Sequence, residues 1–263
     1  MNYYKICEQK LKFFRYSDNT IKSYMFYVDQ FLSTVGVYPS RLNSFHFQKY
    51  LDNYIFTSTS QQNQVISAIK FLYQYGLNKK YNKVCFKRPR KESKIPVIID
   101  KEFLIDKISK ITNLKHKAII TIGYSVGLRV SEVVNLKISD IDSNRMVITV
   151  CQAKGKKDRI VPLTENTLSL LRQYYKQHKP KKYLFNGQKS LKYTSGSCNK
   201  IVKKYLGNKY HFHLLRHSCF TNLTDEGVDL RVIQKLAGHK NSKTTEIYTH
   251  VSTQILNKLP LAV

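Results

Sequence analysis

The run Met146-Val147-Ile148-Thr149-Val150-Cys151 and the run Arg159-Ile160-Val161-Pro162-Leu163 together decide the fold class of this chain. Both are rich in β-branched residues, which favour strands. The segment Lys154-Gly155-Lys156-Lys157-Asp158 between them contains the glycine that a tight turn favours. The two runs therefore predict an antiparallel β-hairpin. Because the sequence around them has helical periodicity, the hairpin indicates a mixed α+β domain.

Helices are predicted on both sides of this hairpin. Before it, apolar residues at helical spacing indicate helices near 101–111 and 115–125, and Ser131-Glu132 begins another after the break at Gly127. After it, helices are expected near 167–177, 197–206, 213–224 and 230–236. Asp229 is a candidate N-cap for the last of these, and Gly238 a candidate C-terminal stop.

A second, all-helical domain is predicted toward the N-terminus. Ser17-Asp18-Asn19-Thr20 offers N-cap residues before a periodic apolar run, and further helices are expected near 46–55 and from Thr59-Ser60 to Gly76. The basic segment 87–97 contains two prolines and is interpreted as a linker. We therefore expect a mainly α chain with a small antiparallel sheet, with a helical domain over 1–86, a linker over 87–97 and a mixed α+β domain over 98–263.

The charge balance indicates the class of partner. The 263 residues include 45 Lys and Arg against 17 Asp and Glu, a formal net charge of +28, and the excess is present on both sides of residue 90. A field of this sign attracts polyanions, of which nucleic acid is the usual one. A basic surface kept for solubility, or for an anionic membrane, is the alternative. Hydrophobic residues make up 42% of the chain, which excludes a disordered polymer.

Cysteine usage and hydropathy bear on the compartment. The cysteine count of five is odd and no pair has Cys-x-x-Cys spacing, which argues against a disulfide framework and against a zinc site. No apolar run has the length of a membrane span, and residues 1–12 lack the apolar core of a signal peptide. We expect a cytoplasmic protein with no membrane contact.

Two short motifs carry arginines that suit a phosphate. In His213-Leu214-Leu215-Arg216, positions three apart share a helix face, so His213 and Arg216 point together. A guanidinium binds two phosphate oxygens at once. In Gly127-Leu128-Arg129-Val130-Ser131-Glu132, the glycine permits a turn that places Arg129 near a helix N-terminus, where anions are favoured. Alternatively, the first pair is ordinary surface, and Arg129 pairs with Glu132.

Other candidates lie in the hairpin and near the C-terminus. Lys154 is at the predicted hairpin tip, where a lysine is either solvated or acts as a proton donor beside a DNA backbone. Lys156, Lys157 and Arg159 compete for that role. Leu236-Ala237-Gly238-His239 is followed by Thr244-Thr245-Glu246-Ile247-Tyr248-Thr249-His250. Tyr248 alone is one of 19 tyrosines.

Taken in order, the candidates are Arg129, Lys154, His213, Arg216, His239 and Tyr248. This series resembles the catalytic series of the tyrosine recombinase family, which includes Xer recombinases and phage integrases. The matching strings are Gly-Leu-Arg-Val-Ser-Glu, Lys-Gly-Lys-Lys-Asp-Arg, His-Leu-Leu-Arg-His, Ala-Gly-His and Thr-Thr-Glu-Ile-Tyr-Thr-His. The resemblance is strong over about residues 95–255 and weaker over 17–75, which are similar to the family's helical core-binding domain. Val126 departs from it, because many relatives have Thr there.

The resemblance implies a two-domain clamp that binds double-stranded DNA at a specific recombination site. It implies that Tyr248 attacks the scissile phosphate, giving a 3′-phosphotyrosine and a free 5′-OH, with no metal and no ATP. Arg129, Arg216, His213 and His239 would stabilise the phosphorane-like transition state, and Lys154 would protonate the leaving oxygen. His213 is the candidate general base. Integration, excision, inversion and dimer resolution remain open as outcomes.

The resemblance also implies a homotetramer on two paired sites that exchanges strands through a Holliday junction. The apolar tail after Tyr248 is expected either to pack on its own domain or to dock into a neighbouring protomer, and the resemblance favours docking. A type IB topoisomerase shares this chemistry without strand exchange, and a DNA-binding protein that has lost catalysis is a further alternative. The complete six-residue series argues against the second. A membrane-surface protein would explain the charge and none of the motifs.

Overall fold

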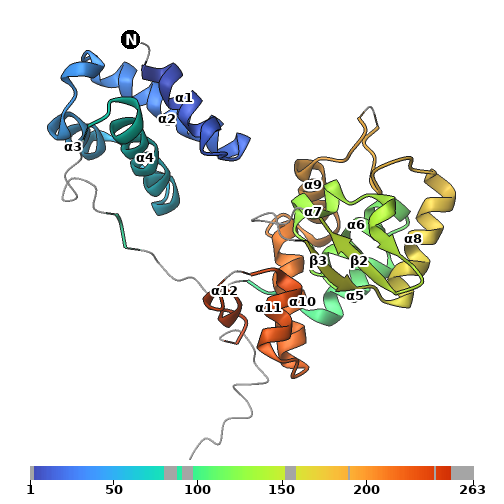
Figure 1. The fold of residues 1–263 in the computed structure, drawn as a ribbon. Coiled ribbons are helices and arrows are strands. Elements are labelled where there is room, and N and C mark those ends of the chain that lie inside the picture. Colours follow the sequence, from blue (N-terminus) through green and yellow to red (C-terminus); the bar gives the residue numbers. More distant parts are fainter. Residues whose placement is uncertain are drawn as a thin grey trace, which may run out of the picture. The chain divides into compact units, whose positions relative to one another are not determined.

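The computed structural model describes residues 3–79, 88–90, 97–151, 158–188, 190–239 and 241–249. The chain divides into two compact units, Met1–Ser93 and Lys94–Val263, each with a hydrophobic core of its own (Figure 1). The described part of the chain is mainly helical with one small antiparallel sheet, which confirms the predicted fold class.

The first unit is all-helical. Its elements are α1 (Tyr3–Phe13), α2 (Asp18–Val35), the 3-10 turn η1 (Pro39–Arg41), α3 (Ser44–Asn53), α4 (Thr59–Phe71) and the π-helical turn η2 (Leu72–Gly76). The predicted start of α2 is confirmed, since the Ser17 hydroxyl accepts a hydrogen bond from the backbone N–H of Thr20. Helix α4 begins at Thr59 and is capped by Ser58, one residue before the predicted Thr59-Ser60. The sequence analysis did not predict α1.

Aromatic side chains fill the core of this unit. Helix α2 packs against α4 and α1. Phe31 of α2 meets Phe47 and Tyr50 of α3 edge-on, with ring centroids 6.2 Å and 5.0 Å apart. These contacts hold α3 against α2.

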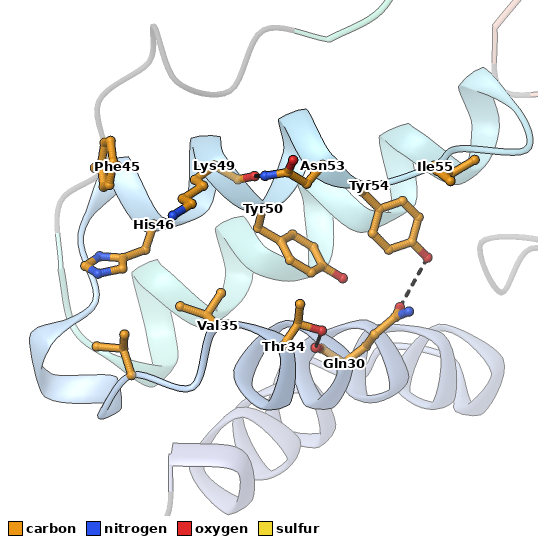
Figure 2. Close-up of a pocket in the computed structure, with 11 residues that line it drawn as sticks. Gln30, Thr34, Val35, Phe45, His46, Lys49, Tyr50, Asn53, Tyr54 and Ile55 are labelled. Atoms are coloured by element: carbon orange, nitrogen blue, oxygen red, sulfur yellow. Dashed lines mark hydrogen bonds between the residues drawn. The ribbon is translucent and has the colours of Figure 1, made fainter.

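A pocket lies between α2 and α3 (Figure 2). Tyr50 and Tyr54 point from α3 and its end toward Gln30 and Thr34 of α2, and the Tyr54 hydroxyl donates to Gln30 Oε1 at 3.2 Å. The buried Tyr50 hydroxyl has no hydrogen-bond partner among the described residues. None of the catalytic candidates lines this pocket.

The second unit contains the sheet. Its elements are α5 (Lys101–Ser109), α6 (Leu114–Ser125), α7 (Val130–Asn135), the 3-10 turn η4 (Ile138–Asp140), β1 (Ile141–Asp142), β2 (Val147–Val150), β3 (Arg159–Pro162), α8 (Glu165–His178), α9 (Ser195–Leu206), α10 (Phe212–Asp225), α11 (Leu230–Ala237) and α12 (Lys243–Glu246). Helix α6 packs against both α8 and α10, at the centre of the core.

The predicted hairpin is confirmed. Strands β2 and β3 pair antiparallel, with Val147 opposite Pro162 and Val150 opposite Arg159. A third strand that the sequence analysis did not predict, β1, pairs with β2 and gives the order β1-β2-β3. The tip of the hairpin, 152–157, lies outside the described residues. Arg159 is the first residue of β3 and follows directly on the hairpin tip. Helix α11 packs against this strand.

Candidate active site

Helix α10 supplies two of the predicted residues. His213 reaches solvent, whereas Arg216 on the same face is 1% exposed. Figure 1 shows α10 and α11 side by side, and the two helices are in contact. This packing places Arg216 between the turn before α7 and the end of α11.

Arg216 joins those two segments. Its Nη1 donates to the carbonyl of Gly127 at 2.6 Å, and its Nη2 donates to the carbonyl of Ala237 at 2.5 Å. The guanidinium also lies over the Phe220 ring, 4.8 Å from its centroid. Burial lowers the pKa of Arg216 to about 10, so the group is still charged at neutral pH. Among the described residues Arg216 has no carboxylate within ion-pair distance, and a buried cation in this position is well suited to an anionic ligand.

Gly127 and Arg129 shape the next segment. Gly127 has φ +65°, and a Cβ there would lie 2.8 Å from Phe220 Cζ, so both the turn and the close packing require glycine. Arg129 is the N-cap residue of α7, as the sequence predicted for its position. Its Nη1 donates to Glu132 Oε1 at 2.9 Å, so the pairing with Glu132 that the sequence left open is present.

The buried carboxylate of Glu132 lies between two partly buried arginines, Arg129 and Arg159. Arg159 Nη1 and Nη2 donate to its two carboxylate oxygens at 2.8 Å each, and the backbone N–H of Arg129 donates to Oε2 at 2.8 Å. Burial alone would raise the pKa of Glu132, but the hydrogen bonds and charge of Arg159, followed by those of Arg129, lower it to about 2. This role of Arg159 was not predicted from the sequence, where Arg159 is only one basic residue of the hairpin string.

His239 follows the glycine that ends α11. Its Nε2 lies 3.2 Å from Arg216 Nη2, which can only donate, and its Nδ1 lies 2.9 Å from Thr245 Oγ1. The ring is therefore the neutral tautomer with its proton on Nδ1. Burial, followed by the charges of Arg216 and Arg129, lowers the pKa of His239 to about 4. In the free chain both ring nitrogens of His239 are therefore engaged, and the ring would have to carry its proton on Nε2 to donate to an anion beside Arg216.

Tyr248 lies just after α12 and is 1% exposed. Its ring is nearly parallel to that of His239 at 6.3 Å and packs on Phe220 at 5.5 Å. Burial raises the pKa of the Tyr248 phenol, while the charge and hydrogen bond of Arg216 act in the opposite direction. The structure therefore brings Tyr248, His239 and Arg216 together in one cluster.

His217 is a further residue that the sequence analysis missed. It lies one turn after His213, whose ring is 4.5 Å away, and its ring is 5.7 Å from that of Tyr248. Its Nδ1 is buried with no hydrogen-bond partner among the described residues. The signal in the sequence was the second histidine of His-Leu-Leu-Arg-His, four residues after the first.

The remaining predicted residue, Lys154, lies outside the described residues, as do its competitors Lys156 and Lys157. The predicted tail after Thr249 lies outside them too. Arg159, the fourth candidate for the proton donor, is described and is fully engaged with Glu132 and with the carbonyl of Leu236. Within the described ranges, no group of three or more His, Cys, Asp or Glu side chains is arranged to hold a metal ion.

The burial of His217 predicts a loss of stability in mild acid. Burial, followed by the charges of His213 and Arg216, lowers its pKa from 6.5 to about 4. Between these two pH values His217 is protonated in the unfolded chain and neutral in the folded chain. The free energy of unfolding is therefore greatest above pH 6.5 and falls as the pH drops toward 4. Between pH 7 and pH 5 the free energy of unfolding should fall in both proteins. We expect the fall to be smaller in His217→Phe than in the wild type, by about 1–2 kcal/mol. Urea unfolding at both pH values measures this, and equal losses in both proteins would contradict it.

Comparison with known proteins places this geometry in a family. Residues 100–254 match the model of the phage integrase family, and residues 4–83 match the model of the phage integrase N-terminal SAM-like domain. The chain belongs to the phage integrase family. In this family member, the arginine, histidine and tyrosine cluster lies entirely within the segment that the first model matches.

Similar proteins carry consistent names. The tyrosine recombinase XerA of Pyrococcus horikoshii is 35% identical over 254 residues, covering 92% of this chain and 86% of that protein. The tyrosine recombinase XerC of Staphylococcus aureus is 33% identical over 273 residues, covering 94% and 90%. From this similarity, the integrase-family chain is an enzyme of the DNA strand-transferase class. It acts in site-specific recombination through a tyrosine intermediate.

Solved structures agree on the fold. The crystal structure of a XerA recombinase is similar with a TM-score of 0.56 and 29% identity, covering 97% of this chain and 95% of that one. A XerH site-specific recombinase bound to a palindromic difH substrate, in a post-cleavage complex, gives a TM-score of 0.71 at 23% identity, covering 90% and 78%. Within its described ranges, this integrase-family chain has no helix long and apolar enough to cross a bilayer.

Proposed function

We propose that this recombinase cleaves and rejoins double-stranded DNA at a specific site through Tyr248. The observation that carries the proposal is the cluster around Arg216, which contacts the segments bearing Arg129 and His239 and lies against Phe220 beside Tyr248. A scissile phosphate bound here would meet two guanidiniums and two imidazoles. The guanidiniums are the donors that an anionic, phosphorane-like transition state needs.

The reaction follows from the residue types. The Tyr248 Oη attacks phosphorus, the bond from phosphorus to the 5′ oxygen breaks, and a 3′-phosphotyrosine forms. His213 accepts the phenol proton, because partial burial and the charge of Arg216 lower its pKa and keep it neutral near pH 7. Lys154 supplies a proton to the 5′ oxygen. Attack by the 5′ hydroxyl of a partner strand reverses these steps, so no ATP and no metal are needed.

Two features of the free chain bear on this reaction. The phenol is buried against Phe220, so it must leave that packing to reach a phosphate. Arg129 is shared between Glu132 and the site, so its second nitrogen is the group that meets the phosphate. Moving the phenol out of its packing and sharing Arg129 with a phosphate both cost free energy. Charge-assisted hydrogen bonds to the bound DNA would offset these costs.

The larger assembly is part of the same proposal. The helical unit and the catalytic unit would close around the duplex as a clamp in the cytoplasm. The affinity for DNA would depend strongly on salt concentration, because the net charge is +28. Four copies on two paired sites would exchange strands through a Holliday junction. The apolar tail after Tyr248 would dock into the neighbouring protomer and join the copies.

The test is covalent trapping in the presence of a chelator. Duplexes selected by binding from a random library are nicked near the centre of the selected site, so that cleavage releases a short fragment and religation is blocked. We expect a protein–DNA adduct in EDTA, attached through the DNA 3′ phosphate to the peptide that contains Tyr248. An adduct at another residue, attachment at the 5′ end, or dependence on a divalent metal would contradict the proposal.

A further inference from the structure

Arg159 makes more contacts with the active-site segments than its place on a strand requires. It donates to both oxygens of Glu132 at 2.8 Å and, through Nε, to the carbonyl of Leu236 at 2.8 Å. Its side chain is 9% exposed. One guanidinium therefore connects the start of β3, the first turn of α7 and the last turn of α11.

The end of α11 is built around this side chain. Gly238 has φ +61°, and a Cβ there would lie 3.1 Å from Arg159 Cδ and 3.4 Å from its Nε. The next carbonyl along, that of Ala237, accepts from Arg216. Two arginines from different elements thus hold successive carbonyls at the C-terminus of a helix, where cations are favoured. His239 follows directly, so its position depends on both.

Arg159 also changes the net charge around Glu132. Glu132 carries one negative charge and contacts two arginines. Arg159 occupies both carboxylate oxygens in the bidentate arrangement that a guanidinium favours, while Arg129 Nη1 contacts only Oε1. The trio has a net charge of +1. Without Arg159, Glu132 and Arg129 would form a neutral pair, and the cation facing the phosphate would be cancelled.

We propose that Arg159 is a positioning residue for the strand-transfer reaction: it offsets the charge of Glu132, so that Glu132 does not cancel the positive charge that Arg129 presents to the scissile phosphate, and it fixes the turn that carries His239. This inference rests on the proposed function. It also assigns Arg159 a part different from that of a proton donor, since all three of its donor nitrogens are engaged within the protein.

The test is a double-mutant cycle between Arg159 and Glu132, read as the single-turnover rate of adduct formation at saturating protein. Arg159→Met should slow that rate by about 10²-fold, the size of effect found when one transition-state donor is lost. In the background of Glu132→Gln, where no carboxylate needs neutralising, the same substitution should slow it by about tenfold or less, because only the contact with the Leu236 carbonyl is lost. Arg159→Lys, which keeps the charge but has a single donor atom, should fall between wild type and Arg159→Met.

Controls separate this effect from unfolding and from failure of the proposed function. Arg172→Met removes an exposed arginine whose nearest carboxylate oxygen, on Glu165, is 3.8 Å away, and should react at the wild-type rate. Glu132→Gln/Arg159→Met leaves no unpaired buried carboxylate, so it should fold even if Arg159→Met alone does not. Equal losses from Arg159→Met with Glu132 and with Gln at that position would overturn the inference, as would an unchanged rate. If the wild type forms no adduct at Tyr248, the proposed function fails instead.

Discussion

Tyr248→Phe should form no covalent adduct with nicked DNA while still binding it. The substitution removes the hydroxyl that we propose attacks phosphorus, and leaves the ring packed on Phe220 and beside His239. DNA affinity should stay within about threefold, because phosphate contacts elsewhere on the basic surface supply most of it. Denaturing gels of the trapped complex and a binding titration at the same salt measure the two quantities.

The fold should tolerate this change. Loss of one buried hydroxyl costs about 1 kcal/mol or less when the surrounding packing is kept. Tyr205→Phe is the matched control, since the Tyr205 hydroxyl hydrogen-bonds His116 Nδ1 at 3.0 Å in the same unit and lies outside the site. That variant should form the adduct at the wild-type rate. An adduct that persists undiminished in Tyr248→Phe would mean that another residue is the nucleophile.

Substitution of Arg216 should separate catalysis from binding. With Arg216→Lys, the charge remains but one ammonium cannot replace the planar fork that reaches both Gly127 and Ala237. We expect adduct formation to slow by about 10³-fold, the upper range for loss of a preorganised transition-state donor. Duplex affinity should change only a few-fold, since one phosphate contact among many is altered.

Arg216→Ala should show the same separation and also lose stability. It leaves the buried carbonyls of Gly127 and Ala237 without a donor and opens a cavity beside Phe220, at a cost of about 3 kcal/mol or more. Rates are therefore compared below the melting transition of each variant. Arg231→Lys, at an exposed position on α11, is the control and should match wild type. Equal losses of cleavage and binding would mean that Arg216 only anchors DNA.

Features that depend on neighbouring residues were predictable from the sequence. The start of α2 at Ser17, the cap of α11 by Asp229 and its end at Gly238 were expected, and the structure has each of them. Capping and left-handed glycine turns involve groups within a few positions of one another, so the local sequence suffices. The β2–β3 pairing was predictable for the same reason, because only a turn separates the two strands.

Weaker local signals were missed. Strand β1 has two residues and α12 has four, too few to show a periodic pattern. The order of the candidate site residues along the chain was nevertheless predicted. It rests on short strings that resemble those of the tyrosine recombinase family, and no contact needs to be known to recognise them.

The sequence alone determined the mainly α plan with one small sheet, and it predicted Arg216, His239 and Tyr248, which the structure brings together. Only the tertiary structure decided how those residues share their charges. Arg159 meets Glu132 and the carbonyl of Leu236, and Arg216 meets the carbonyl of Gly127, across long separations in the chain. Such contacts depend on how β3, α7, α10 and α11 pack, and no periodicity or capping rule encodes that packing. It is this packing that buries Tyr248, places the Arg216 guanidinium against two backbone carbonyls and gives Arg159 its place beside Glu132.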